Sequence, residues 1–225
     1  MKRDVTVCVF AKPPRAGEVK TRLSGALGRA GAATLAKGFF ADTWASVSCR
    51  PWAHVLLATT DSEPPVLPGP TSTERWLQGS GDLGDRMESV LARALGLRLG
   101  DPVLALGCDS PDLPFDRLEL AREALSSHDA VLGPAEDGGY YLLGLKRCPP
   151  GLLAGLPWST AETCARTHER LVEAGLSVHR LEPWFDVDTP EDLSRLIVRL
   201  QQDVLRAPAT WDALVALGVV GELAG

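Results

Sequence analysis

The chain has 225 residues, of which 45% are hydrophobic and 23% are charged, and its formal net charge is -6. This composition is ordinary for a globular protein with a hydrophobic core, and the acidic balance argues against broad nucleic-acid binding. No stretch approaches the ~20 apolar residues that cross a bilayer, so a cytoplasmic protein that does not contact membranes is expected.

Strand-like and helix-like patterns alternate along the chain, beginning with the apolar run VTVCVFA. Strands are predicted at residues 5–11, 54–60, 74–78, 102–109, 129–135, 139–145 and 177–182. Helices are predicted at residues 28–47, 81–99, 115–128, 161–175 and 189–205, with one more short helix in the tail at 210–225. Thr189 is expected to cap its helix, because Pro190 follows it and acidic residues occupy the first turn.

This alternation predicts an α/β fold in which a mostly parallel sheet lies between helices. No repeat or linker divides the chain, so residues 1–225 are expected to form a single domain, with a core at 5–206 and a C-terminal helical tail at 207–225. Ligands of open parallel sheets bind beyond the carboxyl ends of the strands. The polar and glycine-rich segments that follow several predicted strands are therefore expected to share one edge.

The segment FAKPPRAGEVKTRLSGALG, which includes the end of the first strand, gathers the four cations Lys12, Arg15, Lys20 and Arg22 in an acidic chain. Such a loop suits a polyphosphate, and backbone N–H groups at the start of the following helix would add donors. A solvated basic surface loop is the alternative interpretation. Within this segment, neither the Walker A spacing nor G-x-G-x-x-G is present.

Carboxylates follow two other predicted strands. Asp109 ends the apolar run PVLALGCD, and Mg²⁺ is commonly held by one or two carboxylates together with phosphates and water. Asp112 is interpreted as capping or orienting the turn into the next helix. In WFDVDTPEDL, Asp186 and Asp188 point the same way if the segment is extended, so one of them could complete a metal site.

The segment GPAEDGGYYLLG places Glu136 and Asp137 before two glycines. The glycines either let a ligand approach the backbone or form a tight turn between two strands. Tyr140 and Tyr141 point to opposite faces of a strand, so at most one of them is expected to face a ligand. Trp158, in LPWSTAET, either stacks on a sugar or base or packs in the core.

Six motifs in a fixed order resemble the bacterial DUF2064 family, often labelled arsenosugar-biosynthesis-type glycosyltransferase. The resemblance runs from Val5 to Leu200 and is carried by FAKPPRAGEVKTRL, GDLGDRM, GCDSPDLP, LGPAEDGGYYLLGL, PWST and FDVDTPEDL. That family belongs to the nucleotide-diphospho-sugar transferases, so the resemblance implies a single-domain, Rossmann-like glycosyltransferase-A fold. The molybdenum cofactor and phospholactate guanylyltransferases share this fold, and their opening loops look similar.

The resemblance also implies roles for particular residues. The catalytic centre would consist of Lys20, Arg22 and Asp109. The nucleotide would be bound by Ala11, Lys12, Lys20, Arg22, Gln78, Gly81, Leu83, Gly84, Arg86 and Asp109. The sugar or the acceptor would contact Asp137, Gly138, Gly139, Tyr140 and Trp158. Mg²⁺ or Mn²⁺ would be held by Asp109 and Asp188, although Pro111 stands where a strict D-x-D motif has its second acid.

Two reactions fit these residues. The family resemblance favours glycosyl transfer from a nucleotide-diphospho-sugar to a small-molecule acceptor. The four cations favour nucleotidyl transfer, of guanylyl or cytidylyl type, from a nucleoside triphosphate to a phosphate- or phosphonate-bearing substrate with release of pyrophosphate, because a triphosphate needs more neutralisation. A nucleotide-binding protein without catalysis is the third alternative. The protein is expected to be a monomer or a homodimer.

Overall fold

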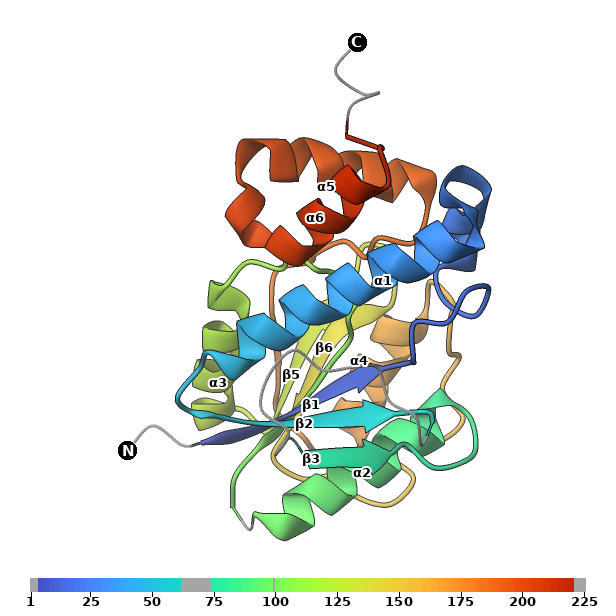
Figure 1. Ribbon diagram of the computed structural model, residues 1–225. Helices are drawn as coiled ribbons and strands as arrows, with labels where there is room; N and C mark the ends of the chain where they lie inside the picture. The colour runs from blue at the N-terminus through green and yellow to red at the C-terminus, as the bar shows by residue number, and fades with distance from the viewer. Residues whose placement is uncertain (1–3, 62–73, 99, 221–225) are drawn as a thin grey trace.

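In the computed structural model, residues 4–61, 74–98 and 100–220 are described. Within them, one seven-stranded sheet has the spatial order β3-β2-β1-β4-β6-β5-β7 (Figure 1). The strands are β1 (Val5–Ala11), β2 (Ala53–Thr59), β3 (Glu74–Leu77), β4 (Val103–Leu106), β5 (Ala130–Pro134), β6 (Tyr140–Leu145) and β7 (Val178–Arg180). Neighbouring strands are parallel except where β6 pairs with β4 and β5. The predicted α/β fold with a mostly parallel sheet is confirmed.

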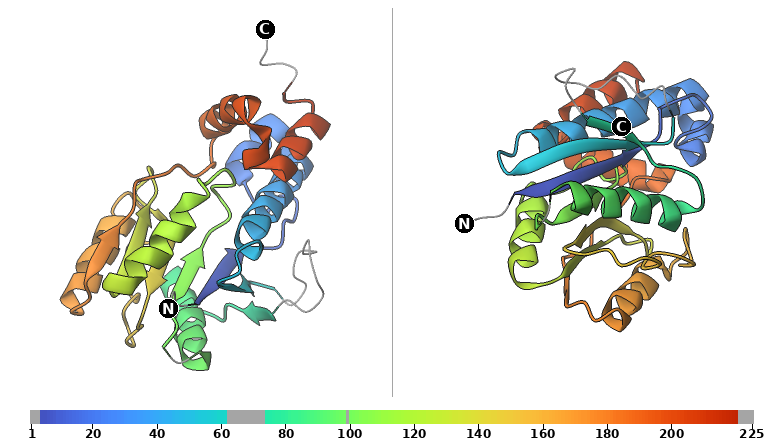
Figure 2. Two further views of the ribbon diagram at one scale, coloured as in Figure 1. Left: turned by 90° about the vertical axis from the view of Figure 1, so that its left-hand side faces the viewer. Right: turned by 90° about the horizontal axis from the view of Figure 1, so that it is seen from below.

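Helices cover both faces of this sheet. The helices of the described residues are α1 (Ser24–Ser48), α2 (Leu83–Leu97), α3 (Asp116–Ser127), α4 (Thr163–Glu173), α5 (Pro190–Gln202) and α6 (Pro208–Ala216), with 3-10 turns η1 (Thr21–Leu23) and η2 (Val204–Arg206). One apolar cluster joins α1 and α3 to the sheet, and another joins α2 and α4 to its opposite face. A third cluster joins α1 to α5 and α6, which lie over α1 at one end of the molecule (Figures 1 and 2).

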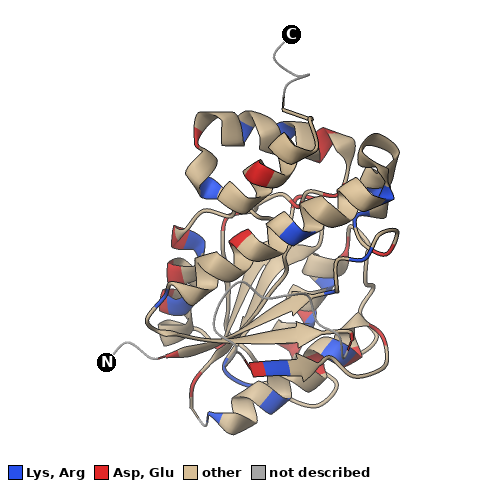
Figure 3. Ribbon diagram, viewed as in Figure 1, with Lys and Arg blue, Asp and Glu red and all other residues tan. Residues whose placement is uncertain are grey.

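Charged residues are distributed as this layered fold requires. Figure 3 shows Lys, Arg, Asp and Glu mostly on helices and loops, while the central strands carry almost none. Strands that are covered on both faces read as continuous apolar runs, which is why β1 and β4 are easily found in the sequence. None of the helices in the described ranges combines the length and the apolar composition that a membrane crossing requires.

Several element boundaries differ from the predicted ones. Helix α1 begins at Ser24 rather than at residue 28, and the chain kinks at Gly28, where φ is 70° and ψ is 163°. A residue with a Cβ disfavours that left-handed φ, so glycine permits the kink. Strand β4 ends at Leu106, which leaves Asp109 in the loop that follows it. The proline-rich stretch at 62–70 and the tail at 221–225 lie outside the described residues.

The prediction for Thr189 is confirmed. Its side chain accepts a hydrogen bond from Asp192 N, while the Asp192 carboxylate accepts one from Thr189 N, and Pro190 occupies the first helical position. This capping box satisfies two backbone donors at the start of α5. It also fixes the direction in which the preceding residue, Asp188, enters the helix.

A buried carboxylate fastens α6 to α1. Asp42, in α1, is 6% exposed and accepts hydrogen bonds from Ala209 N (2.9 Å) and Thr210 N (2.7 Å). These N–H groups belong to the first turn of α6, where the helix has no acceptors of its own. One turn earlier in α1, a Cβ on Gly38 would lie 2.9 Å from Ala209 O, so glycine lets the two helices approach this closely.

Replacing Asp42 by Ala is expected to lower the free energy of unfolding by about 1–3 kcal/mol, because two N–H groups lose their acceptor in a buried interface. Urea unfolding followed by circular dichroism measures the change. Asp212→Ala, at an exposed position of α6, is the matched control and should change stability by less than about 0.5 kcal/mol. Equal effects of the two substitutions would contradict a capping role for Asp42.

Candidate functional site

A cavity of about 470 Å³ opens where the carboxyl ends of β1 and β4 meet the amino end of the antiparallel strand β6. Segments far apart in the sequence meet in its wall. The predicted site residues that line it are Ala11, Lys12, Lys20, Gln78, Leu83, Arg86, Asp109, Asp137, Gly139, Tyr140, Trp158 and Asp188. The structure therefore gathers the predicted phosphate, nucleoside, metal and sugar segments around one space.

Four predicted site residues do not line this cavity. Arg22 is exposed on η1, outside the wall. At Gly81, Gly84 and Gly138 other parts of the protein approach the backbone closely, because a Cβ on each would overlap Asp85, Leu153 or Ala161, respectively. Glycine at these positions therefore permits close packing beside the cavity.

The ammonium of Lys20 lies between two carboxylates. Its Nζ pairs with Asp109 and with Asp188 Oδ1, the latter at 2.9 Å, and its side chain is 7% exposed. Burial alone would lower the pKa of Lys20, but the two carboxylates outweigh burial and raise it. The sequence predicted that Lys20 faces phosphates, whereas in this structure it neutralises the two residues predicted to hold a metal.

Backbone and side-chain hydrogen bonds hold the two acidic segments together. Val187 N donates to Asp109 O at 2.8 Å, and Ser110 Oγ donates to Asp186 Oδ1 at 2.5 Å. These bonds join the loop after β4 to the segment that precedes α5. Asp109 and Asp188, 79 positions apart in the chain, are thereby directed at the same cation.

Of the two roles predicted for Asp112, capping the next helix or orienting the turn into it, capping is wrong. It does not cap α3, whose N-cap residue Phe115 makes no side-chain capping bond. Asp112 is 1% exposed, accepts from Arg199 Nε at 2.6 Å and accepts from Trp184 Nε1 at 3.3 Å. A carboxylate is rarely buried without a charged partner, so this ion pair fixes the loop after β4 against α5.

Asp186 also lines the cavity but is not one of the two acids that contact Lys20. The pKa of Asp186 is raised to about 7, chiefly by burial and in part by the negative charges of Asp109 and Asp137, against the opposing effect of the Ser110 hydrogen bond. The carboxylates of Asp186 and Asp188 thus have separate partners. Of the two acids that the sequence offered for a metal site, Asp188 is the one that shares a cation with Asp109.

Polar side chains of Gln78, which follows β3, and of Arg86, in α2, form a wall on one side of the cavity. Gln78, 4% exposed, donates from Nε2 to Ala58 O at 2.9 Å and accepts at Oε1 from Arg86 Nη1 at 3.2 Å. Arg86 Nε also donates to the carbonyl of Asp82, the N-cap residue of α2, at 3.1 Å. The Gln78 amide and the Arg86 guanidinium are therefore fixed in orientation before any ligand arrives.

Aromatic side chains form another part of the wall. The rings of Tyr140 and Trp158 meet edge to face, with centroids 6.2 Å apart and planes at 68°. Within the described residues, the buried Nε1 of Trp158 has no hydrogen-bond partner. Tyr141 lines the cavity as well, although its hydroxyl points away and donates to Glu182 O at 3.1 Å. As expected for neighbouring residues of a strand, Tyr141 and Tyr140 pack in the clusters on opposite faces of the sheet, and both line the cavity at the start of β6.

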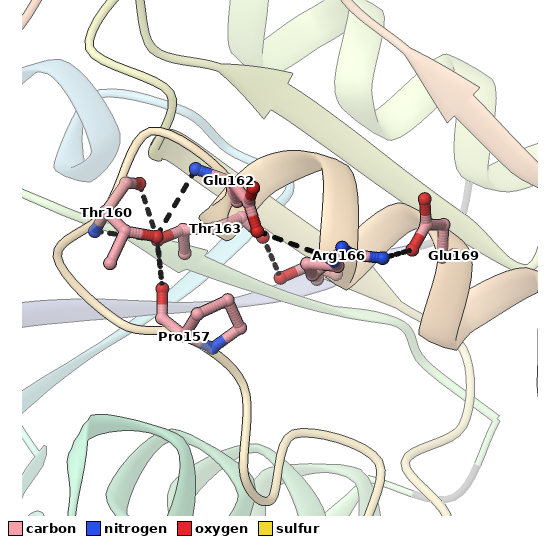
Figure 4. A network of polar contacts seen from close by, with 7 residues as sticks. Pro157, Thr160, Glu162, Thr163, Arg166 and Glu169 are labelled. Atoms are coloured by element: carbon pink, nitrogen blue, oxygen red, sulfur yellow. Dashed lines mark hydrogen bonds and ion pairs between the residues drawn. The ribbon is translucent and has the colours of Figure 1, made fainter.

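The loop that carries Trp158 is held by its own threonines (Figure 4). Thr163 Oγ1 and Thr160 Oγ1 both donate to Pro157 O, at 2.6 and 2.9 Å. Ser159, which immediately precedes Thr160, has φ 59°, a left-handed conformation that a non-glycine residue rarely adopts. A strained residue in a tightly bonded loop at a cavity wall is a feature that functional sites often show.

Replacing Gly84 by Ala is expected to destabilise the protein by about 1–3 kcal/mol, because the new methyl group would overlap Leu153 O and lie 2.8 Å from Trp158 Nε1. Thermal unfolding measures the loss, and tryptophan fluorescence reports displacement of Trp158. Gly96→Ala is the control, since no atom lies within 4 Å of a Cβ there. A neutral Gly84→Ala variant would contradict this packing role.

The four cations of the first loop do not all lie in the cavity wall. Arg15 pairs with Asp61 at 2.5 Å, Arg22 lies outside the cavity, and Lys20 is engaged by two acids. Lys12 is exposed, lines the cavity, and makes no ion pair within residues 4–61, 74–98 and 100–220. Lys12 and Lys20 are thus the two cations of this loop in the cavity wall.

Asp109 and Asp188 fit a divalent cation that is shared with substrate phosphates. In the part of the chain that the structure describes, no group of three or more His, Cys, Asp or Glu side chains is arranged to hold a metal ion. Mg²⁺ in nucleotide sites, however, uses one or two carboxylates together with phosphate oxygens and waters. That both carboxylates contact a single ammonium shows that they are directed at one cation-sized volume.

Some cavity residues were not singled out in the sequence. Ala36, Phe39 and Phe40 come from α1, where helical spacing of apolar residues indicated only core packing. Cys108, which follows the apolar strand β4, also lines the cavity. The motif PWST was noted for its tryptophan, but its Ser159 and Thr160 line the cavity too.

The sheet order, the single reversed strand and the cavity at the strand ends define a nucleotide-diphospho-sugar-transferase-like fold. The chain belongs to the family DUF2064, described as "Uncharacterized protein conserved in bacteria", whose profile matches residues 44–160, more than half of the chain. Among curated proteins, none matches it significantly.

Three solved structures illustrate the fold relationship. A protein from Desulfovibrio desulfuricans G20, provisionally named a nucleotide-diphospho-sugar transferase, is 30% identical with a TM-score of 0.81, and the match covers 96% of each chain. CMP:2-keto-3-deoxy-manno-octonic acid synthetase, solved with CTP, is 14% identical with a TM-score of 0.55, covering 89% of this chain and 99% of that one. Rv0371c from Mycobacterium tuberculosis H37Rv, solved with manganese, is 18% identical with a TM-score of 0.51, covering 87% and 98%. The last two likenesses concern the fold alone.

Proposed function

We propose that this chain is a transferase that requires Mg²⁺ or Mn²⁺ and moves a glycosyl group from a nucleotide-diphospho-sugar to a small-molecule acceptor. The observation that carries the proposal is the convergence of Asp109 and Asp188 on one cation at the wall of the cavity. The 30% identical relative with the provisional name of nucleotide-diphospho-sugar transferase supports it. The manganese in Rv0371c, a protein of the same fold, supports the choice of metal.

The charge distribution favours a diphosphate as the bound group. A nucleoside triphosphate brings more negative charge than a diphosphate into a cavity whose wall already carries Asp109, Asp137, Asp186 and Asp188. The first loop supplies two cations to that wall rather than the four that the sequence offered. This smaller positive charge is matched better by the two phosphates of a nucleotide sugar.

Each wall has a distinct role in this proposal. Gln78 and Arg86 bind the nucleoside, and Lys12 and Lys20 bind phosphate oxygens. Asp137, Tyr140 and Trp158 contact the sugar or the acceptor. A metal ion held by Asp109 and Asp188 would supply positive charge where the leaving diphosphate becomes more negative.

Nucleotidyl transfer is the second candidate. The fold is shared with a synthetase that was solved with CTP, and Lys12, Lys20 and a divalent ion together could neutralise a triphosphate. In that reaction, a substrate oxygen attacks the α-phosphorus and pyrophosphate leaves. The two candidates use the same cavity and differ in the bond that breaks.

The products distinguish the two candidates. The purified protein is incubated with Mg²⁺ and either a panel of nucleotide sugars or a panel of nucleoside triphosphates, each with pooled small-molecule acceptors, and followed by phosphorus NMR. The proposal predicts release of a nucleoside diphosphate from one nucleotide sugar. Release of pyrophosphate from a triphosphate would establish the second candidate. Metal-dependent binding without any release from either panel would favour a non-catalytic nucleotide-binding protein.

We also propose that residues 1–225 act as one domain with a core at 5–206 and a tail at 207–225, as a monomer or homodimer. The packing of α6 on α1 through Asp42 and Gly38 supports a single cooperative unit. If so, the Asp42→Ala variant should unfold in one transition at a lower urea concentration.

A further inference from the structure

We propose that Lys20 is an exchangeable internal cation, which occupies the metal position until a bound phosphate gives its ammonium another partner. This inference rests on the proposed function, because it assigns the same two carboxylates to a divalent ion. The motivating observation is that Lys20 Nζ contacts both Asp109 and Asp188, with its side chain 7% exposed.

The ammonium and a divalent ion compete for the same ligands. An ion shared by Asp109 and Asp188 would need the oxygens that already accept from Lys20. Two cations this close would repel each other strongly in a partly buried site. A divalent ion therefore binds weakly while the ammonium remains, even though the carboxylates are correctly directed.

The surroundings keep Lys20 in this position when no phosphate is present. Its Nζ also lies 5.3 Å from the centroid of the Phe39 ring, a cation–π contact. Besides the two pairing acids, Asp186 and Asp137 line the same cavity and add negative charge. Without a counter-cation, this concentration of carboxylates would be unfavourable, so the lysine stabilises the free protein.

The backbone conformation of Lys20 indicates that the fold specifies the position of its ammonium. Lys20 has φ 46° and ψ 44°, a left-handed conformation that costs energy for any residue with a Cβ. The turn η1 begins immediately after it. In this backbone conformation the Lys20 ammonium pairs with both carboxylates, and strained residues of this kind cluster at functional sites.

A phosphate releases the ammonium. Lysine carries a point charge with three rotatable donors on a flexible stem, so it can exchange carboxylate oxygens for phosphate oxygens within the same cavity. The exchange couples the two ligands, because a phosphate draws Lys20 away from the acids and thereby opens the metal position. Metal and phosphate should consequently bind with positive cooperativity, each raising the affinity for the other.

The test measures Mn²⁺ binding by electron paramagnetic resonance and calorimetry in wild type, Lys20→Met and the control Lys37→Met, at an exposed position of α1 that does not line the cavity. Without phosphates, Lys20→Met is expected to bind Mn²⁺ about tenfold or more tightly than wild type, while Lys37→Met stays within about twofold. The melting temperature gives a second readout. Lys20→Met should melt lower than wild type without metal and gain more on adding Mn²⁺.

The wild-type protein provides a readout that does not depend on a variant. In nitrogen NMR of the lysine ammonium groups, Mg²⁺ alone should leave the Lys20 signal in place, whereas Mg²⁺ with inorganic pyrophosphate should shift it. Pyrophosphate is used because it carries two phosphates and no base.

The outcomes separate this inference from the proposed function. One outcome would overturn the exchange alone: wild type and Lys20→Met bind Mn²⁺ equally well, and Asp188→Asn abolishes the binding. The assignment of the metal site to Asp188 would then remain supported. An absence of Mn²⁺ binding in both proteins, with and without pyrophosphate, would overturn both the exchange and the proposed metal dependence. Tighter binding in Lys20→Met alone supports the exchange.

Discussion

Replacing Asp109 or Asp188 by Asn is expected to abolish the effect of Mg²⁺ on nucleotide binding and to lower transferase activity by about 100-fold or more. Each substitution removes one of the two charged ligands that converge on a single cation. The fold should survive, since the two side chains are 53% and 42% exposed. Calorimetric titration with each nucleoside diphosphate, with and without Mg²⁺, measures the loss.

Asp116→Asn is the matched control for these two variants. Asp116 is an exposed acid in the first turn of α3 and is not part of the cavity wall. Its replacement removes the same charge and should leave the Mg²⁺ effect as in wild type. If Mg²⁺ raises nucleotide affinity equally in wild type, Asp109→Asn and Asp188→Asn, the metal is bound elsewhere.

The largest effect on stability is expected for Arg199→Ala. Asp112, whose side chain is fully buried, would lose its cationic partner, and leaving a buried charge unpaired costs about 3–5 kcal/mol. The guanidinium also lies 4.6 Å from the centroid of the Trp184 ring. For a protein of this size, such a loss lowers the melting temperature by roughly 6–20 °C, which calorimetry measures.

Arg206→Ala gives the comparison on the surface. Arg206 pairs with Asp203 at 3.4 Å, but both side chains are more than 40% exposed, and such pairs contribute less than about 1 kcal/mol. Adding Asp112→Asn to Arg199→Ala should recover part of the stability, because a neutral amide is less costly to bury than a carboxylate. If Arg199→Ala costs no more than Arg206→Ala, the buried pair does not hold the loop after β4 against α5.

The order of elements could be predicted because strands and helices of this fold differ in hydrophobic period. Buried strands such as β1 and β4 are continuous apolar runs, and α5 begins with a capping box that is visible as Thr189, Pro190 and Asp192. The kink at Gly28 was missed, because a glycine within a helical pattern does not reveal its φ angle.

The positions of strand ends in the sequence predict which segments meet at the site, but they do not predict the contacts within it. That principle brought Asp109, Asp188 and Lys20 to one edge. It could not show that the lysine would pair with the acids, since ion pairing depends on distances that the sequence does not contain. The role of Asp112 was missed for the same reason, because its partner Arg199 lies 87 positions away.

The glycines of the GSGDLG and EDGG segments show a second limit of prediction from the sequence. The sequence marks Gly84 and Gly138 as places where something approaches the backbone closely. It does not say whether a ligand or another loop does so. In the structure, Leu153 approaches Gly84 and Ala161 approaches Gly138, so close packing accounts for glycine at both positions.

The central claim, a divalent ion held by Asp109 and Asp188 beside a bound nucleotide, is tested most directly by crystals grown with Mn²⁺ and a nucleoside diphosphate. The anomalous signal of manganese locates the ion without reference to the protein atoms. The account predicts a manganese peak within coordinating distance of both carboxylates and of a phosphate oxygen, with the Lys20 ammonium moved from between the acids onto phosphate. A nucleotide bound in the cavity with no manganese at Asp109 and Asp188 would contradict it.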